Sequence, residues 1–101
     1  MKSFILFMHA DTRDQALAND GQKWGEYFAS LHASGCFEGG SSIGQGIKFR
    51  RDHPDEPSRP DLGGFVRVRA ESLADATRFL AKNPIYQAGG TVEIRELPPD
   101  E

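Results

Sequence analysis

The spacing of apolar residues changes along the chain, and each spacing predicts an element. The block Lys2–His9 (KSFILFMH) is almost continuously apolar and ends at a polar cluster, which predicts a strand. Because both faces of this strand are apolar, we expect both to be buried. Helices of a small domain cover one face of a sheet, so the second face is expected to meet a partner. The two faces are Phe4, Leu6 and Met8, and Ile5, Phe7 and His9.

Apolar residues first recur with the spacing of a helix in the segment Asp20–Ser34, which is therefore predicted to be a helix. Asn19 or Asp20 can cap its start, and Gly35 suits the position just past its end. The helix could begin earlier, near Arg13, although two glycines in the first turns oppose this extension. One amphipathic stripe is formed by Trp24, Tyr27, Phe28 and Leu31.

The second helical period follows Ser72, whose side chain is expected to cap a helix. Asp75 stands three residues later, which is a capping-box pattern with Asp in place of Glu. The pair Asn83-Pro84 is expected to end the helix. The predicted buried stripe consists of Leu73, Ala76, Phe79 and Leu80.

The remaining apolar blocks predict three further strands. These are expected to begin at Cys36–Glu38 and to cover Gly63–Arg69 and Thr91–Leu97. Glycines after Glu38 bend or break the first of them, and Ile43 and Ile47–Phe49 can continue it as a ribbon. The charged, proline-rich segment Arg50–Asp61 (RRDHPDEPSRPD) is predicted to be a solvated loop, and Pro98–Glu101 a tail.

The element order is therefore β-α-β-β-α-β, a ferredoxin-like α+β arrangement with both helices on one face of an antiparallel sheet. The strand Gly63–Arg69 alternates between an apolar face with Val66 and Val68 and a mixed face. We expect the open face of the sheet to be mixed, and such a face commonly pairs with a second copy, which predicts a homodimer. The expected open-face residues are Phe65, Arg67, Arg69, Glu93 and Arg95, or the complementary set.

Composition narrows the class of protein. A chain of 101 residues provides one core, so we expect 1–101 to be a single domain that carries the charged loop at 50–61. The net charge of −3 and the lack of a basic tract argue against nucleic acid as a partner. No apolar run is long enough for a membrane span or a signal peptide. The single cysteine, Cys36, cannot form an internal disulfide, which favours the cytoplasm.

The second half of the chain resembles a known family. Leu62–Val66 (LGGFV), Glu71–Ala76 (ESLADA) and Asn83-Pro84 followed by Ala88–Leu97 (AGGTVEIREL) look like the YCII-related domain family. The most similar branch is the one called the DGPF domain. The resemblance covers nearly the whole chain, and the segment Arg50–Asp61 matches least.

The resemblance implies a ferredoxin-like monomer that assembles as a dimeric α+β barrel, in small cytoplasmic proteins that mostly have no assigned activity. Some members carry a His–Asp pair proposed to act as general acid and base on small ring compounds. By this alignment Trp24 and Asn83 stand at the two positions, and neither side chain titrates near neutral pH. The family's Asp-Gly-Pro-Phe tetrapeptide is also absent. The acid–base pair is thus replaced, while the cleft between helices and sheet is expected to remain.

Several residues have both a functional and a structural interpretation. His9 and Asp11 could form a general base and its orienting carboxylate, or His9 could simply end a strand. Trp24 could floor a ligand pocket and offer one donor, or pack in the core. Asn83 could orient a ligand or terminate a helix. Tyr86 could line the cleft or pack on the surface.

Arginines gather on two predicted strands. If those strands are neighbours, Arg67, Arg69 and Arg95 meet Glu93 in cross-strand ion pairs, and alternatively Arg67 or Arg95 clamps an anionic substrate. No ligand-spaced motif predicts a metal, and the glycines do not form a phosphate-binding loop, so no cofactor is predicted.

Three functional hypotheses follow. The first is a cytoplasmic homodimer that holds a small organic molecule, with acids among the candidates, in a cleft between sheet and helices. The expected lining residues are His9, Trp24, Asn83 and Tyr86. The second is a small lyase, isomerase or hydrolase with His9 as base, Asp11 as its orienting partner, and Arg67 or Arg95 fixing an anion. The third is a non-catalytic dimeric adaptor that binds a protein through Arg50–Asp61.

Overall fold

The computed structural model describes residues 1–99, so the end of the predicted tail, residues 100 and 101, lies outside the described chain. Four strands form one antiparallel sheet in the order β2-β5-β1-β6. They are β1 (Lys2–His9), β2 (Phe37–Ser42), β5 (Leu62–Ala70) and β6 (Val92–Leu97). This strand order is the ferredoxin-like order, which confirms the predicted fold class.

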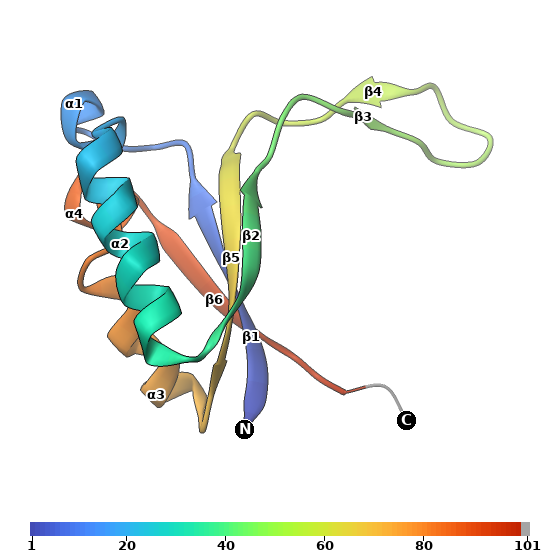
Figure 1. Cartoon of the computed structure of the whole chain (residues 1–101). Coiled ribbons are helices and arrows are strands. Elements are labelled where there is room, and N and C mark those ends of the chain that lie inside the picture. The colour runs from blue at the N-terminus through green and yellow to red at the C-terminus, as the bar shows by residue number, and fades with distance from the viewer. Residues whose placement is uncertain (100–101) are drawn as a thin grey trace.

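The helices lie together on one face of the sheet (Figure 1). They are α1 (Gln15–Ala18), α2 (Gly21–Ser34), α3 (Leu73–Ala76), the 3-10 turn η1 (Thr77–Leu80) and α4 (Pro84–Gln87). Among the described residues, none of these helices is long and apolar enough to cross a membrane.

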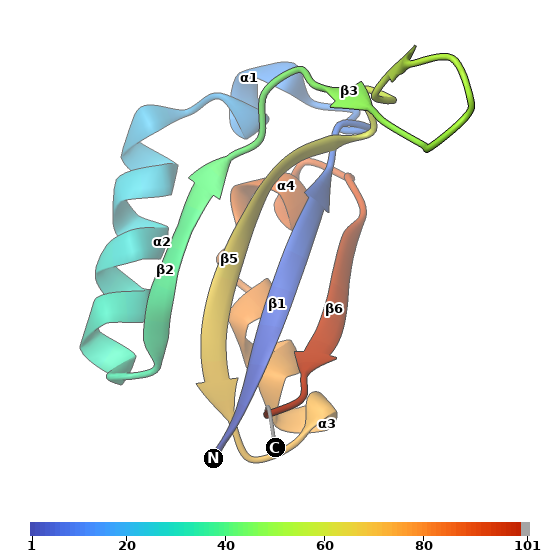
Figure 2. The same ribbon diagram turned by 90° about the vertical axis from the view of Figure 1, so that its right-hand side faces the viewer.

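The core lies between this helical layer and the sheet. Phe4, Leu6 and Met8 of β1 are buried there, as predicted. The other face of β1 is only half-buried, because no helix covers it (Figure 2). On this open face Ile5 lies between Arg67 and Arg95, and Phe7 lies between Phe65 and Glu93. The described chain therefore leaves uncovered one of the two faces that the sequence predicts to be buried.

Helix α2 begins and ends close to the predicted bounds, because the residues at its two ends cap it. The Asp20 carboxylate accepts hydrogen bonds from the backbone N–H groups of Gln22 and Lys23, at 3.0 and 3.2 Å. Gly35 ends the helix with a φ of +72°, a conformation that favours glycine. The turn before it is a separate helix, α1, capped by Asp14, rather than an extension of α2.

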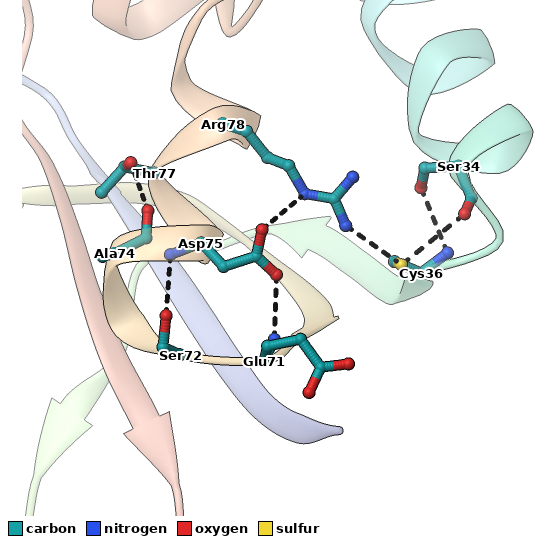
Figure 3. Close-up of polar contacts among 8 residues, drawn as sticks. All are labelled: Ser34, Cys36, Glu71, Ser72, Ala74, Asp75, Thr77 and Arg78. Atoms are coloured by element: carbon teal, nitrogen blue, oxygen red, sulfur yellow. Dashed lines mark hydrogen bonds and ion pairs between the residues drawn. The ribbon is translucent and has the colours of Figure 1, made fainter.

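The second helical segment begins at Ser72 as predicted, but it consists of one short helix, α3, and the 3-10 turn η1. The pair Asn83-Pro84, which was expected to end it, lies after η1 and begins the further helix α4. Ser72 accepts from the Asp75 N–H at 3.1 Å, and Asp75 accepts from the Glu71 N–H at 2.9 Å (Figure 3). Leu73 is 54% exposed, so its predicted place in the buried stripe was wrong. It is the first residue of α3, where the chain has only just left the sheet, whereas Ala76 in the next turn is buried.

Cys36 is buried where α2 passes into β2, beside this helical segment (Figure 3). Its thiol lies 3.6 Å from the Ser34 carbonyl oxygen, and the Arg78 guanidinium donates to its sulfur at 3.5 Å. The same guanidinium forms an ion pair with Asp75 at 3.4 Å. These contacts tie the end of α2 to the second helical segment.

Residues 43–61, here called the arm, form a hairpin that projects from the sheet on the side opposite the helices (Figure 1). Its two strands, β3 (Ile47–Lys48) and β4 (Glu56–Pro57), pair with each other in a separate sheet. The segment predicted to be a solvated loop is exposed throughout, but it contains β4, which the sequence did not predict. A strand of only two residues shows no alternation, so it could not be recognised within a charged and proline-rich segment.

Candidate functional site

A cleft of about 480 Å³ lies where the ends of β1 and β2 meet the start of β5, below α1 and α2. The aromatic wall of the cleft comes from Trp24 and Phe28 of α2, and Phe65 of β5, which belongs to the open face of the sheet, borders the cleft at the strand. The polar groups that line it are His9, Thr12, Gln15, Asn19, Ser41 and Ser42. The arrangement suits a small molecule with a flat apolar body and a few polar substituents.

Glycines in the sheet make room for this cleft. Gly40 and Gly64 lie on facing strands, and a Cβ at Gly40 would lie 2.5 Å from the Phe65 carbonyl oxygen. A Cβ at Gly64 would lie 3.1 Å from the Ser41 carbonyl oxygen. Close strand pairing therefore requires the glycine at Gly40, and the missing side chains leave space below α2.

Trp24 lines the cleft, which is the position in which it could form the floor of a ligand pocket. Its ring stacks on Phe28, with ring centroids 5.9 Å apart and an interplanar angle of 27°. The indole N–H donates to the Ala18 carbonyl oxygen at 2.7 Å. The expectation that this donor is free for a ligand was therefore wrong, and Trp24 offers its ring alone.

His9 lies at the cleft and is paired with a carboxylate, but the carboxylate is Glu93. The His9 Nε2 is 3.2 Å from Glu93 Oε1, and Glu93 Oε2 accepts from Arg95 Nε at 2.6 Å. The hydrogen bond from Arg95, and then that from His9, lower the pKa of Glu93 below its usual value. An ionised carboxylate only accepts hydrogen bonds, so Nε2 carries a proton, and in the uncharged form of the ring Nδ1 is the nitrogen that accepts.

Asp11 does not orient His9, because Thr91 engages its carboxylate. Asp11 accepts from the Thr91 N–H at 2.8 Å and from the Thr91 hydroxyl at 2.6 Å. The hydroxyl bond, followed by the backbone bond, lowers the pKa of Asp11. The pairing predicted for His9 and Asp11 was wrong because β1 ends at His9, so the strand alternation does not continue to Asp11. Asp11 instead ties the chain after β1 to the start of β6.

Asn83 and Tyr86 do not line the cleft, contrary to expectation. Asn83 is fully buried and begins α4 by capping it. Its Oδ1 accepts from the N–H groups of Ile85 and Tyr86 at 3.0 and 3.1 Å, and its Nδ2 lies 3.4 Å from the Met8 sulfur. Tyr86 is 51% exposed. Ile85 is the residue of α4 that reaches the cleft.

Arg67 and Arg95 lie on the open face of the sheet, away from the cleft lining. The strands that carry them are not neighbours, because β1 lies between β5 and β6. Arg95 is held by Glu93, whereas Arg69 donates to the Gly35 carbonyl oxygen at 2.8 Å. The predicted anion clamp in the cleft, and the predicted cross-strand pairing of Arg67 and Arg69 with Glu93, were therefore wrong.

The partner of His9 and several cleft residues were missed from the sequence. Glu93 could have been found, because the ferredoxin-like order places the last strand beside the first and both residues belong to the set that faces away from the helices. Ser41 and Ser42 gave no signal, because short polar residues in a glycine-rich strand are typical of turns. Phe28 was predicted only as part of the amphipathic stripe of its helix.

The fold and the cleft are those of a small α+β protein, and a comparison with family models identifies its family. The chain belongs to the YCII-related domain family, whose family model matches residues 1–99. Its assignment to the DGPF branch stays a prediction. A search of curated proteins finds no match.

Among solved structures, the chain is similar to the 5-chloro-2-hydroxyhydroquinone dehydrochlorinase of Burkholderia phenoliruptrix, solved in complex with 2,5-dihydroxybenzoquinone. The two share 18% sequence identity and a TM-score of 0.58 over 95% of this chain and 93% of that chain. A likeness at this identity establishes a shared fold.

Proposed function

We propose that this protein binds a small, flat organic molecule in the cleft. The observation that carries the proposal is the aromatic wall of Trp24 and Phe28 beside about 480 Å³ of space with a polar rim. Ligand pockets are commonly about 300–1,000 Å³, mostly apolar, and equipped with a few placed polar groups. An aromatic ring can stack on such a wall while its substituents meet the rim.

The ligand class that we propose is a ring compound bearing a hydroxyl or acid group. The lone pair on His9 Nδ1 is suited to accept a hydrogen bond from a ligand hydroxyl. The Ser42 hydroxyl lines the cleft and can donate to a ring oxygen, whereas the Ser41 hydroxyl already donates to the Ser42 carbonyl oxygen at 2.9 Å. The bound 2,5-dihydroxybenzoquinone of the similar fold is a ring of this class, which supports the choice of probe.

Tryptophan fluorescence tests this proposal, because Trp24 is the one tryptophan of the sequence and lines the cleft. We expect titration with 2,5-dihydroxybenzoquinone to give saturable quenching, after correction with free tryptophan amide for light absorbed by the quinone. Ser42→Phe fills the cleft and should abolish saturation, whereas the matched control Ser42→Ala leaves the cleft open and should still give saturable quenching, with affinity weakened only by the loss of one hydroxyl. Equal binding by Ser42→Phe, with an unchanged circular dichroism spectrum, would refute the cleft as the site.

A second candidate function is proton transfer on the bound ring, and the His9–Glu93 pair favours it. Glu93 fixes the ring tautomer of His9, so that Nδ1 can take a proton from an acidic C–H or O–H of the ligand and return it. Such a step needs no further reactant. We expect the protein to accelerate exchange of the ring C–H protons of 2,5-dihydroxybenzoquinone in heavy water. His9→Gln should lose this acceleration and keep binding, and exchange by His9→Gln at the original rate would refute the role.

We also infer that the protein acts as a cytoplasmic homodimer joined through the open sheet face. Ile5 and Phe7 are half-buried apolar residues on that face, and none of the described helices covers them. Glu93 and Arg95 form an ion pair beside them, so two charges of this face are already matched within the chain.

A further inference from the structure

The arm exposes the largest apolar side chains that project from the open side of the sheet. Ile47 is 58% exposed and Phe49 is 74% exposed. Phe49 and Pro54 form a shallow cup of about 400 Å³ on the arm, rimmed by Lys48, Arg50, His53 and Glu56. An exposed Phe beside an exposed Ile on a protruding hairpin is unusual for a surface that meets only water, because aromatic side chains gain most when buried.

The arm has few interactions of its own. Its two strands pair at two positions, Ile47 with Pro57 and Lys48 with Glu56. The ion pair between Lys48 and Glu56 is 3.5 Å long and exposed, so it adds little stability. An isolated two-stranded hairpin is marginally stable in water. The arm therefore needs a second surface to hold Ile47 and Phe49.

The position of the arm indicates where that surface lies. The arm joins β2 to β5 and projects beyond the open face, away from the helices (Figures 1 and 2). The helical layer of its own chain is on the far side of the sheet and cannot reach it. Whatever covers the open face must also meet the arm.

The open face is too small to hold a stable dimer without the arm. Four strands about 4.8 Å apart and about six paired residues long, at about 3.3 Å per residue, give a footprint of about 400 Å². A specific, stable interface buries about 800 Å² on each partner. Among the described residues, the arm, with 19 exposed or half-exposed residues, is the longest segment on that side able to supply the remainder.

We propose that the arm is a clamp that grips a second copy of this chain. In this assembly the open faces of two copies meet, and each arm reaches past the interface so that Ile47 and Phe49 pack on the partner. The arm carries four basic and four acidic residues, so its charges balance and it can approach the mixed surface of another copy without net repulsion. This proposal rests on the homodimer inferred above, and it adds the segment that makes the homodimer stable.

Sedimentation velocity over a dilution series of the full chain tests the clamp. The double variant Ile47→Ser with Phe49→Ser removes the apolar contacts of the arm. Leu73→Ser is the matched control, because Leu73 is also exposed, at 54%, but lies on the helical side. We expect the double variant to raise the dissociation constant of the dimer at least tenfold and Leu73→Ser to leave it unchanged.

A third variant, Ile5→Glu, separates the clamp from the homodimer because it places a charge at the centre of the open face. If Ile5→Glu dissociates the dimer while the arm variant dimerises as tightly as the unsubstituted chain, the homodimer stands and the clamp is refuted. A monomer for the unsubstituted chain at all concentrations refutes both. Ligand binding, followed separately by Trp24 fluorescence, reports on the cleft proposal independently of either result.

Discussion

Replacing Asn83 by Ala should destabilise the protein strongly, because one buried side chain begins a helix and faces the core. Asn83 is fully buried, its Oδ1 accepts from two N–H groups of α4, and its Nδ2 meets the Met8 sulfur. Losing the cap costs about 1 kcal/mol. Leaving the half-buried Ile85 N–H without its partner, together with the small void, adds about 1–2 kcal/mol. We therefore expect Asn83→Ala to lower the free energy of unfolding by about 2–3 kcal/mol.

Urea unfolding followed by circular dichroism measures this loss, at one fixed protein concentration because dimerisation would add to stability. Asn83→Ser is the matched variant, since a serine hydroxyl can also cap a helix, and it should recover about 1 kcal/mol. In thermal unfolding the Ala variant should melt about 8–24 °C lower. A loss below about 0.5 kcal/mol, or equal losses for Ala and Ser, would show that the cap is not the source of the stability.

Two further predictions concern hydrogen bonds described above. Tyr27→Phe removes the hydroxyl that donates to the Phe79 carbonyl oxygen at 2.9 Å, and it should cost about 1–2 kcal/mol in urea unfolding, whereas no measurable loss would contradict the bond. Because the bonds from Thr91 lower the pKa of Asp11, their stabilising effect is present above about pH 4 and is lost as the pH falls through the lower folded pKa. Asp11→Asn should therefore flatten the acid side of a plot of melting temperature against pH, and an unchanged slope would refute this linkage.

The long elements could be predicted from the sequence because local signals and burial agree in them. Lys2–His9 and Gly21–Ser34 have a clear period and, in the helix, caps at both ends, and both elements appear with nearly the expected bounds. The short elements could not be predicted. Helices α1 and α4 have four residues each, and β4 has two, so no period is visible in them.

The candidate site was harder to predict than the fold, because its contacts join residues far apart in the sequence. His9 and Trp24 both border the cleft, since a strand end and an amphipathic helix define their positions, and their role in binding stays a prediction. Asp11 was chosen for being close in sequence, but its true partner, Thr91, lies across the sheet edge. Asn83 carried two opposite interpretations, and only the burial of its side chain shows that it caps α4.

A crystal structure of the protein with 2,5-dihydroxybenzoquinone tests the central claim most directly. The account predicts the ring in the cleft against Trp24 and Phe28, with a ring oxygen within hydrogen-bond distance of His9 Nδ1. Ring density confined to the open face or the arm, with the cleft empty at saturating ligand, would contradict it.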